Sequence, residues 1–114
     1  MEMGKIMSKE KKIEIIKELI GKKETERAYC ALLRQMGDLK ANYGDYLITE
    51  PINCDEELKR VPEADYELCT ALLTMLLRED HFFNGSLVRR CESGAVDSVL
   101  KRMIQELERE EALL

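Results

Sequence analysis

The sequence has little of what most enzymes and metal-binding proteins use. It contains no tryptophan, one histidine, two phenylalanines and two prolines in 114 residues. Any histidine-based catalysis or metal binding therefore depends on His81 alone, and no cysteine lies near it in the sequence. The four cysteines lack the short spacings of a zinc site, and no P-loop, G-x-G-x-x-G or G-x-S-x-G motif occurs. We therefore expect no enzymatic activity, no cofactor and no bound metal.

Long apolar runs are also missing. No segment is apolar for long enough to cross a bilayer, and the first residues lack the apolar stretch of a signal peptide. Cys30, Cys69 and Cys91 lie beside apolar residues in helical patterns, where a reduced cysteine packs as a small hydrophobic residue. These features favour a cytoplasmic protein with reduced cysteines and no membrane partner.

Basic charge is too dispersed for a nucleic-acid-binding face. The net charge is −5, and residues 41–80 contain ten acidic but only three basic side chains. Residues 1–40 are slightly basic, with ten basic and seven acidic side chains. Since binding to phosphates requires clustered Lys and Arg, we expect no direct contact with nucleic acid. An uneven charge pattern of this kind also permits self-association.

What the sequence does contain is apolar residues at helical spacing. Intervals of three and four residues recur over most of its length and predict an all-α protein, a compact bundle of about five helices. The predicted helices span residues 9–20, 25–36, 62–83, 86–93 and 96–107. An irregular acidic loop, residues 38–61, separates the second helix from the third and contains one helical turn at 55–60. We expect residues 1–8 to be disordered and residues 9–114 to form a single helical domain.

The predicted central helix ends in an aromatic corner. Apolar residues cover most of the circumference of residues 62–83, which makes this segment the core helix. Phe82 and Phe83 come at its end and precede Asn84-Gly85, a pair that commonly terminates helices. We predict that Phe82 packs back onto the core, so that its truncation to alanine costs about 3–5 kcal/mol.

Residues 62–107 resemble a known family. The residues that carry the resemblance are Ala71-Leu72-Leu73-Thr74, Arg78, Phe82 with Gly85, Gly94 and Leu100-x-Arg102-Met103, with a fainter echo in Gly44-Asp45-Tyr46. This pattern is similar to the C-terminal signature of the small bacterial proteins grouped as domain of unknown function 6508. His81 stands where the family usually has a second arginine, and Asn84 where it usually has an acid. The family is uncharacterised, so the resemblance implies a fold and no activity.

The polar turn after the aromatic corner is the best candidate for a small-molecule site. Asn84-Gly85-Ser86 opens a helix whose first amides can bind an anion, and Ser86 can cap that helix. The candidate residues are Arg78, His81, Asn84, Ser86, Arg89 and Arg90. They predict a pocket for a nucleotide-like anion. The competing interpretation is a capped turn with solvated arginines.

Two functions from different classes follow from these patterns. The first is a small, acidic, non-catalytic interaction protein that forms a dimer or binds a partner protein. Asp55, Glu56 and Glu57 would then supply acidic complementarity. Ile13, Ile16 and Ile20, or the face of the last helix, would supply apolar contact. One form of this function is inhibition of a nucleic-acid-handling or defence enzyme, by occupying its basic groove as phage-borne inhibitors do. The second function is small-molecule binding in the anion pocket.

Overall fold

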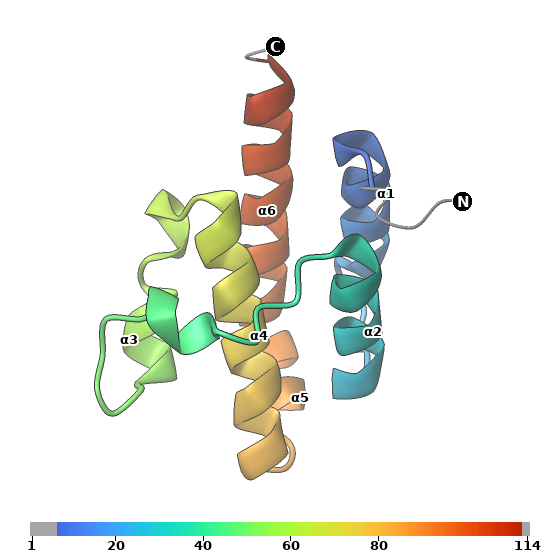
Figure 1. The fold of residues 1–114 in the computed structure, drawn as a ribbon. Helices are drawn as coiled ribbons and strands as arrows, with labels where there is room; N and C mark the ends of the chain where they lie inside the picture. Colours follow the sequence, from blue (N-terminus) through green and yellow to red (C-terminus); the bar gives the residue numbers. More distant parts are fainter. Residues whose placement is uncertain (1–6, 113–114) are drawn as a thin grey trace.

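A computed structural model describes residues 7–112 of the chain, and within this range it contains six α-helices, two 3-10 turns and no strand (Figure 1). The helices are α1 Lys9–Leu19, α2 Glu26–Met36, α3 Cys54–Leu58, α4 Tyr66–Phe82, α5 Ser86–Glu92 and α6 Ala95–Ala112. The prediction of an all-α bundle is confirmed. The helix in addition to the five predicted is α3, which forms where the sequence predicts one helical turn in the acidic loop.

The structure describes only part of the N-terminal segment that the sequence predicts to be disordered. Of the predicted disordered residues 1–8, residues 1–6 lie outside the described range. Met7 packs against the core, and Ser8 is the N-cap of α1, where its side chain accepts a hydrogen bond from the amide of Lys11. Among the helices between residues 7 and 112, none combines the length and the apolarity needed to span a bilayer.

Helix α4 is the central element, as the sequence predicts. Every residue from Cys69 to Leu77 is buried, and α2, α5 and α6 all pack against this helix. It begins later than predicted, because Asp65 caps it by accepting a hydrogen bond from the amide of Leu68 at 2.8 Å. Pro62 lies in the preceding 3-10 turn, Val61–Glu63, and not in the first turn of α4. A side-chain cap thus sets the start of α4.

Helix α1 packs along α6, and its apolar face is used inside the domain (Figure 1). Ile13 and Ile16 are buried, and Ile20 is partly buried against the same core. The inward face of α6 is buried as well, with Val96, Val99, Leu100, Met103 and Leu107 all in the core cluster. The prediction that these two apolar strips contact a partner is therefore wrong, because both strips are buried in the core of the domain.

The acidic loop is ordered around a buried carboxylate. Glu57, on α3, is completely buried and accepts hydrogen bonds from the amides of Ile48 and Thr49 at 2.9 and 2.7 Å. The hydroxyl of Thr49 donates to the same carboxylate oxygen, and Arg60 pairs with the other oxygen at 2.9 Å. The loop therefore folds back on α3 and holds it beside α4.

Candidate functional site

The aromatic corner at the end of α4 faces solvent. Phe82 is 69% exposed and Phe83 is 67% exposed, so the prediction that Phe82 packs onto the core is wrong. The reason is that the last turn of α4 extends beyond the packed part of the bundle (Figure 1). Gly85 then adopts a φ of 94°, a left-handed conformation that suits glycine, and turns the chain back into α5.

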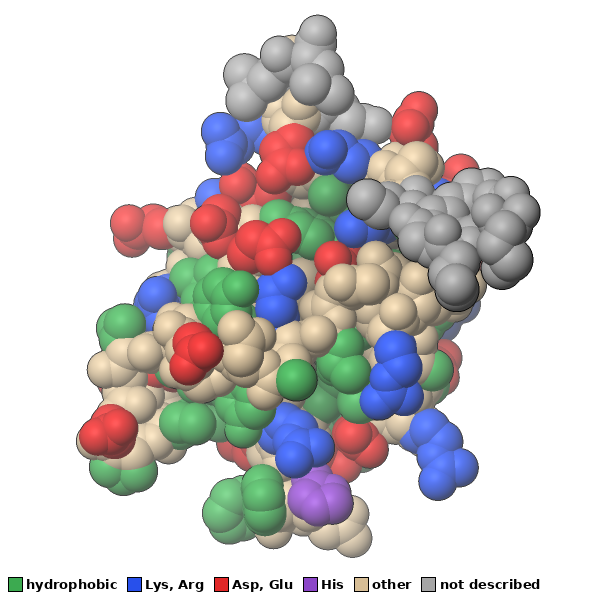
Figure 2. All heavy atoms as spheres, in the orientation of Figure 1, with side chains coloured by type: hydrophobic (Ala, Val, Ile, Leu, Met, Phe, Trp, Pro, Cys, Tyr) green, Lys and Arg blue, Asp and Glu red, His purple; other side chains and the backbone are tan. Residues whose placement is uncertain are grey.

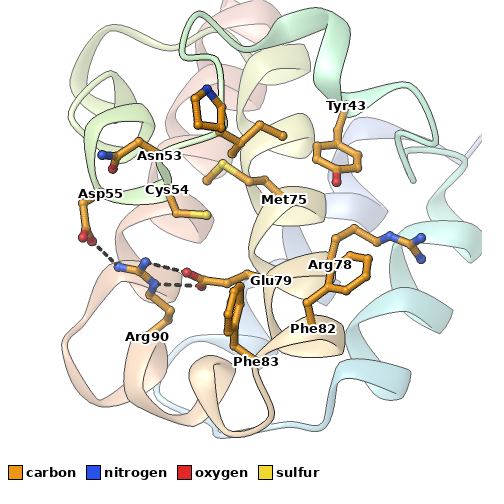
Figure 3. Close-up of a pocket in the computed structure, with 12 residues that line it drawn as sticks. Tyr43, Asn53, Cys54, Asp55, Met75, Arg78, Glu79, Phe82, Phe83 and Arg90 are labelled. Carbon is orange, nitrogen blue, oxygen red and sulfur yellow. Dashed lines mark hydrogen bonds and ion pairs between the residues drawn. The ribbon is translucent and has the colours of Figure 1, made fainter.

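The exposed phenylalanines border a cavity of about 480 Å³ between α3, the loop before it and the C-terminal half of α4 (Figure 3). We call this cavity the Phe82 groove. It is lined by Tyr43, Pro51, Ile52, Asn53, Cys54, Asp55, Met75, Arg78, Glu79, Phe82, Phe83 and Arg90. Ile52, another lining residue, is 47% exposed. Figure 2 shows hydrophobic side chains grouped beside the single histidine at the lower end of the molecule.

One side of the groove is closed by an ion cluster centred on Arg90. Its guanidinium binds both carboxylate oxygens of Glu79, at 3.0 and 2.8 Å, and one oxygen of Asp55 at 2.6 Å (Figure 3). These hydrogen bonds from Arg90 hold the pKa of Glu79 and of Asp55 below the usual range. The cluster joins α5, α4 and α3. It holds two carboxylates and one guanidinium, and Arg78 is the second cationic residue of the lining.

Replacing Arg90 with alanine is expected to lower the free energy of unfolding by about 1.5–3 kcal/mol. The reason is that Glu79, whose side chain is only 16% exposed, loses both of its charged donors. Urea unfolding followed by circular dichroism measures the change. Arg89→Ala is the matched control, because Arg89 is exposed on the same helix and has no ion pair among the described residues. Equal stability of the two variants would show that the cluster does not anchor α3.

The anion pocket predicted at the start of α5 is assembled only in part: Ser86, Arg89 and Arg90 line a cavity of about 290 Å³ together with Asp55 and Glu79. The amides of Gly85 and Leu87 already donate to one carboxylate oxygen of Asp80, at 3.2 and 3.0 Å. Asp80 thereby takes the capping role predicted for Ser86, whose buried hydroxyl has no hydrogen-bond partner among the described residues. Arg90 is held by its two carboxylates. An anion at this helix end would have to displace Asp80.

The other residues predicted for that pocket point to separate places. His81 is exposed and packs edge-on against Phe82, with ring centroids 5.2 Å apart. Asn84 is exposed in the turn. Arg78 lines the Phe82 groove, but its side chain extends away from the groove toward α2 (Figure 3).

The acidic triplet on α3 does not form a free acidic surface. The prediction is wrong for Glu57, which is 0% exposed because its carboxylate organises the loop. Asp55 pairs with Arg90, and Glu56 pairs with Lys59 at 2.9 Å. Their charges are therefore largely offset within the domain, and the acidic complementarity expected from this segment is reduced.

Sequence reasoning missed Tyr43, Pro51 and Ile52 as lining residues, because they come from the irregular loop, whose path over α4 depends on tertiary contacts. A signal for the exposed phenylalanines was present. Directly before Phe82, the apolar run that ends at Leu77 gives way to four consecutive polar residues, 78–81, which indicates that this end of α4 has left the core.

Residues 4–110 match the model of a family of unknown function (DUF6508). The match covers nearly the whole chain. It therefore extends well upstream of residues 62–107, the segment whose residues resemble the family's C-terminal signature. No curated protein and no solved structure matches the chain. Within residues 7–112, no three His, Cys, Asp or Glu side chains lie close enough together to hold a metal ion.

Proposed function

The chain belongs to the family of unknown function DUF6508, and from its Phe82 groove we propose that it is a non-catalytic module that binds an amphipathic segment of a partner protein. The observation that carries this proposal is the exposure of both phenylalanines, at 69% and 67%, on the rim of a cavity of about 480 Å³. Exposed apolar clusters beside a concave surface are typical of protein contacts.

The apolar rim provides the binding energy. The large hydrophobic residues that are exposed within residues 7–112 are Ile48, Ile52, Phe82, Phe83 and Val88, and three of the five border the groove. Covering about 200 Å² of ring surface at ~25 cal/mol per Å² contributes about 5 kcal/mol before the costs of association. Aromatic side chains beside a pocket are also the usual hot spots of protein interfaces.

The charges of the groove indicate the chemistry of the partner. Asp55 and Glu79 both pair with Arg90, and Arg78 is the one charged lining group without an ion pair among the described residues. A fitting occupant therefore presents apolar side chains to Phe82 and Phe83. An acidic flank that continues past the edge of the groove meets Arg78, whose side chain extends toward α2. A helix with an apolar stripe and an acidic flank has this pattern.

A second copy of the chain fits the groove less well. In a two-fold dimer the same patch meets itself, so each Arg78 would need an unpaired carboxylate in the groove of the other copy. The groove carboxylates are already bound to Arg90. Inhibition of an enzyme by occupying its basic groove is likewise less well supported, because the α3 carboxylates that would bind such a groove have partners within the domain.

We also propose that the module acts in the cytoplasm. All four cysteines are free thiols, a state that a reducing compartment maintains. Burial raises the pKa of Cys54, which lines the groove, to about 11, with the charge of Glu79 acting in the same direction. Its thiol is therefore protonated near neutral pH, which supports a binding role for the groove over nucleophilic catalysis.

The proposal is tested with the double substitution Phe82→Ala and Phe83→Ala. A partner recovered with the wild-type chain is identified and purified, and its affinity for each variant is measured by calorimetry. We expect the double variant to bind at least a hundredfold more weakly, while its free energy of unfolding changes by less than about 0.5 kcal/mol because both rings are exposed. The small stability change separates this result from the loss of a core residue.

Val88→Ala is the control, because Val88 is 50% exposed on α5 and does not line the groove. Binding of the partner should also slow modification of Cys54 by a maleimide. Unchanged affinity in the double variant would overturn the proposal. So would light scattering that shows a dimer which the double substitution dissociates, since the occupant would then be a second copy.

A further inference from the structure

A second cavity, of about 520 Å³, lies between α2, α4 and the chain that follows α2. We call it the basic pocket. It is lined by Glu26, Arg27, Cys30, Ala31, Arg34, Leu39, Lys40, Ala41, Tyr43, Thr74, Leu77 and Arg78. It shares only Tyr43 and Arg78 with the Phe82 groove. The side chain of Arg78, which extends toward α2 in Figure 3, reaches into this pocket.

The pocket concentrates arginines that the domain does not use internally. Four of the eight arginines, Arg60, Arg90, Arg102 and Arg109, form ion pairs. The other four, Arg27, Arg34, Arg78 and Arg89, have no ion pair and no hydrogen bond from the guanidinium among the described residues. Three of these four line the basic pocket. The remaining unpaired arginine, Arg89, lies on α5 and is a natural control.

The local charge is opposite to that of the whole chain. Four cationic side chains line the pocket and Glu26 is its only acidic one, although the net charge of the protein is −5. Lys40 is paired with Glu67, and Glu26 accepts a hydrogen bond from the thiol of Cys30 at 3.2 Å. With Lys40 balanced by Glu67, three arginines face one lining carboxylate, Glu26, so the pocket keeps an excess of positive charge.

The charges of two of the arginines reach the thiol of Cys30, which lines the same pocket. Burial raises the pKa of the Cys30 thiol to about 11, with its hydrogen bond to Glu26 acting in the same direction, while the charges of Arg34 and Arg78 oppose the rise. Arg34, from α2, and Arg78, from α4, both line the same cavity as this thiol. The thiol itself stays protonated near neutral pH and serves as a reporter.

We infer that the basic pocket binds a small molecule whose phosphoryl or carboxylate group is attached to an apolar or aromatic body. Each guanidinium group is a planar fork of N–H donors, and two or three of them around one cavity can bind several oxygens of a carboxylate or phosphoryl group. The side chain of Leu39 and the ring of Tyr43, both partly exposed, offer contact for the body of the ligand. The volume lies within the range of small-molecule sites.

This site is distinct from the proposed protein-binding groove. Arg34 and Cys30 line the basic pocket only, whereas Phe82, Phe83 and Cys54 line the groove only. Substitutions at Arg34 therefore test the pocket without touching the groove, and the phenylalanine variant tests the groove without touching the pocket. The failure of one proposal leaves the other standing.

The test uses phenyl phosphate, benzoate and inorganic phosphate as probes in calorimetric titrations of the full chain at low salt. We expect saturable one-to-one binding, with phenyl phosphate bound at least tenfold more tightly than inorganic phosphate. Arg34→Gln and Arg78→Gln should each weaken phenyl phosphate binding at least tenfold. Arg89→Gln, and the double variant Phe82→Ala and Phe83→Ala, should leave it unchanged. The comparison of phenyl phosphate with benzoate shows whether the pocket prefers a phosphoryl or a carboxylate group.

Thiol modification gives a second, independent measurement. Phenyl phosphate should slow the reaction of Cys30 with a maleimide and leave the rate at Cys54 unchanged. The inference is overturned if no probe saturates. It is equally overturned if Arg89→Gln weakens binding as much as Arg34→Gln, because the attraction would then be a general charge effect, or if Cys54 is protected in place of Cys30.

Discussion

Replacing Glu57 with alanine is expected to lower the free energy of unfolding by about 3–5 kcal/mol, the loss typical of breaking a buried, hydrogen-bonded ion pair. The carboxylate is 0% exposed and accepts four hydrogen bonds, from the amides of Ile48 and Thr49, the hydroxyl of Thr49 and the guanidinium of Arg60. Alanine leaves these donors without an acceptor in the loop. Urea unfolding at pH 7 measures the loss.

The control for this variant is Glu56→Ala, one residue earlier on the same short helix. Glu56 is exposed and pairs only with the exposed Lys59, so its removal should change the free energy of unfolding by less than about 0.5 kcal/mol. If the two variants unfold at the same urea concentration, Glu57 does not organise the acidic loop. A destabilised Glu57 variant should also bind a groove partner more weakly, because α3 forms one wall of the groove.

The same carboxylate makes stability depend on pH in a defined direction. Burial alone would raise the pKa of Glu57, but its hydrogen bonds from Thr49, Arg60 and Ile48 outweigh burial, and the net pKa is lowered. Because the pKa is lowered in the folded state, the contribution of ionised Glu57 to the free energy of unfolding is complete above the ordinary glutamate pKa of about 4.3. This contribution is lost as the pH falls below that value. The wild-type chain should therefore lose more stability than Glu57→Gln between about pH 5 and pH 3.

The helices could be predicted from the sequence because their signal is local. Apolar spacing of three and four residues placed α1, α2, α4 and α6, and Thr25 and Gly37 cap α2 as expected from their residue types. The capping of α5 could not be predicted in the same way. Ser86 and Asp80 both have suitable side chains, and only the folded chain places the carboxylate of Asp80 on the amides.

The candidate sites depend on tertiary contacts that periodicity does not contain. The spacing of apolar residues assigns Phe82 to a helix but does not show where the neighbouring helices end. Whether the ring is buried depends on whether those helices extend far enough to cover it. Similarly, the sequence identifies Arg78 and Arg90 as candidate binding residues but not their surroundings. Arg90 is held by two carboxylates, and Arg78 joins arginines of α2 that lie more than 40 residues earlier in the chain.

A second buried polar group should be nearly as sensitive as Glu57. Asp38 is 6% exposed, and one of its carboxylate oxygens accepts the hydroxyl of Tyr66 at 2.5 Å and pairs with the ammonium of Lys12 at 3.0 Å. These contacts join α1, the chain after α2 and the start of α4. The hydrogen bond and the negative charge of Asp38 add to burial in raising the pKa of Tyr66, so the phenol remains a donor at all ordinary pH values.

Asp38→Ala is expected to lower the free energy of unfolding by about 3–4 kcal/mol, because Lys12 is left as a largely buried charge without its partner. Tyr66→Phe removes only one hydrogen bond and should cost about 1–2 kcal/mol. The decisive variant is the double substitution Asp38→Ala with Lys12→Met. Removing the stranded charge as well should restore about 1 kcal/mol or more relative to Asp38→Ala alone, since a buried charge costs more than a buried apolar chain of similar length. If the double variant is less stable than Asp38→Ala, Lys12 stabilises the fold without Asp38, for instance through its contact with the ring of Tyr66, whose centroid lies 5.5 Å from the ammonium.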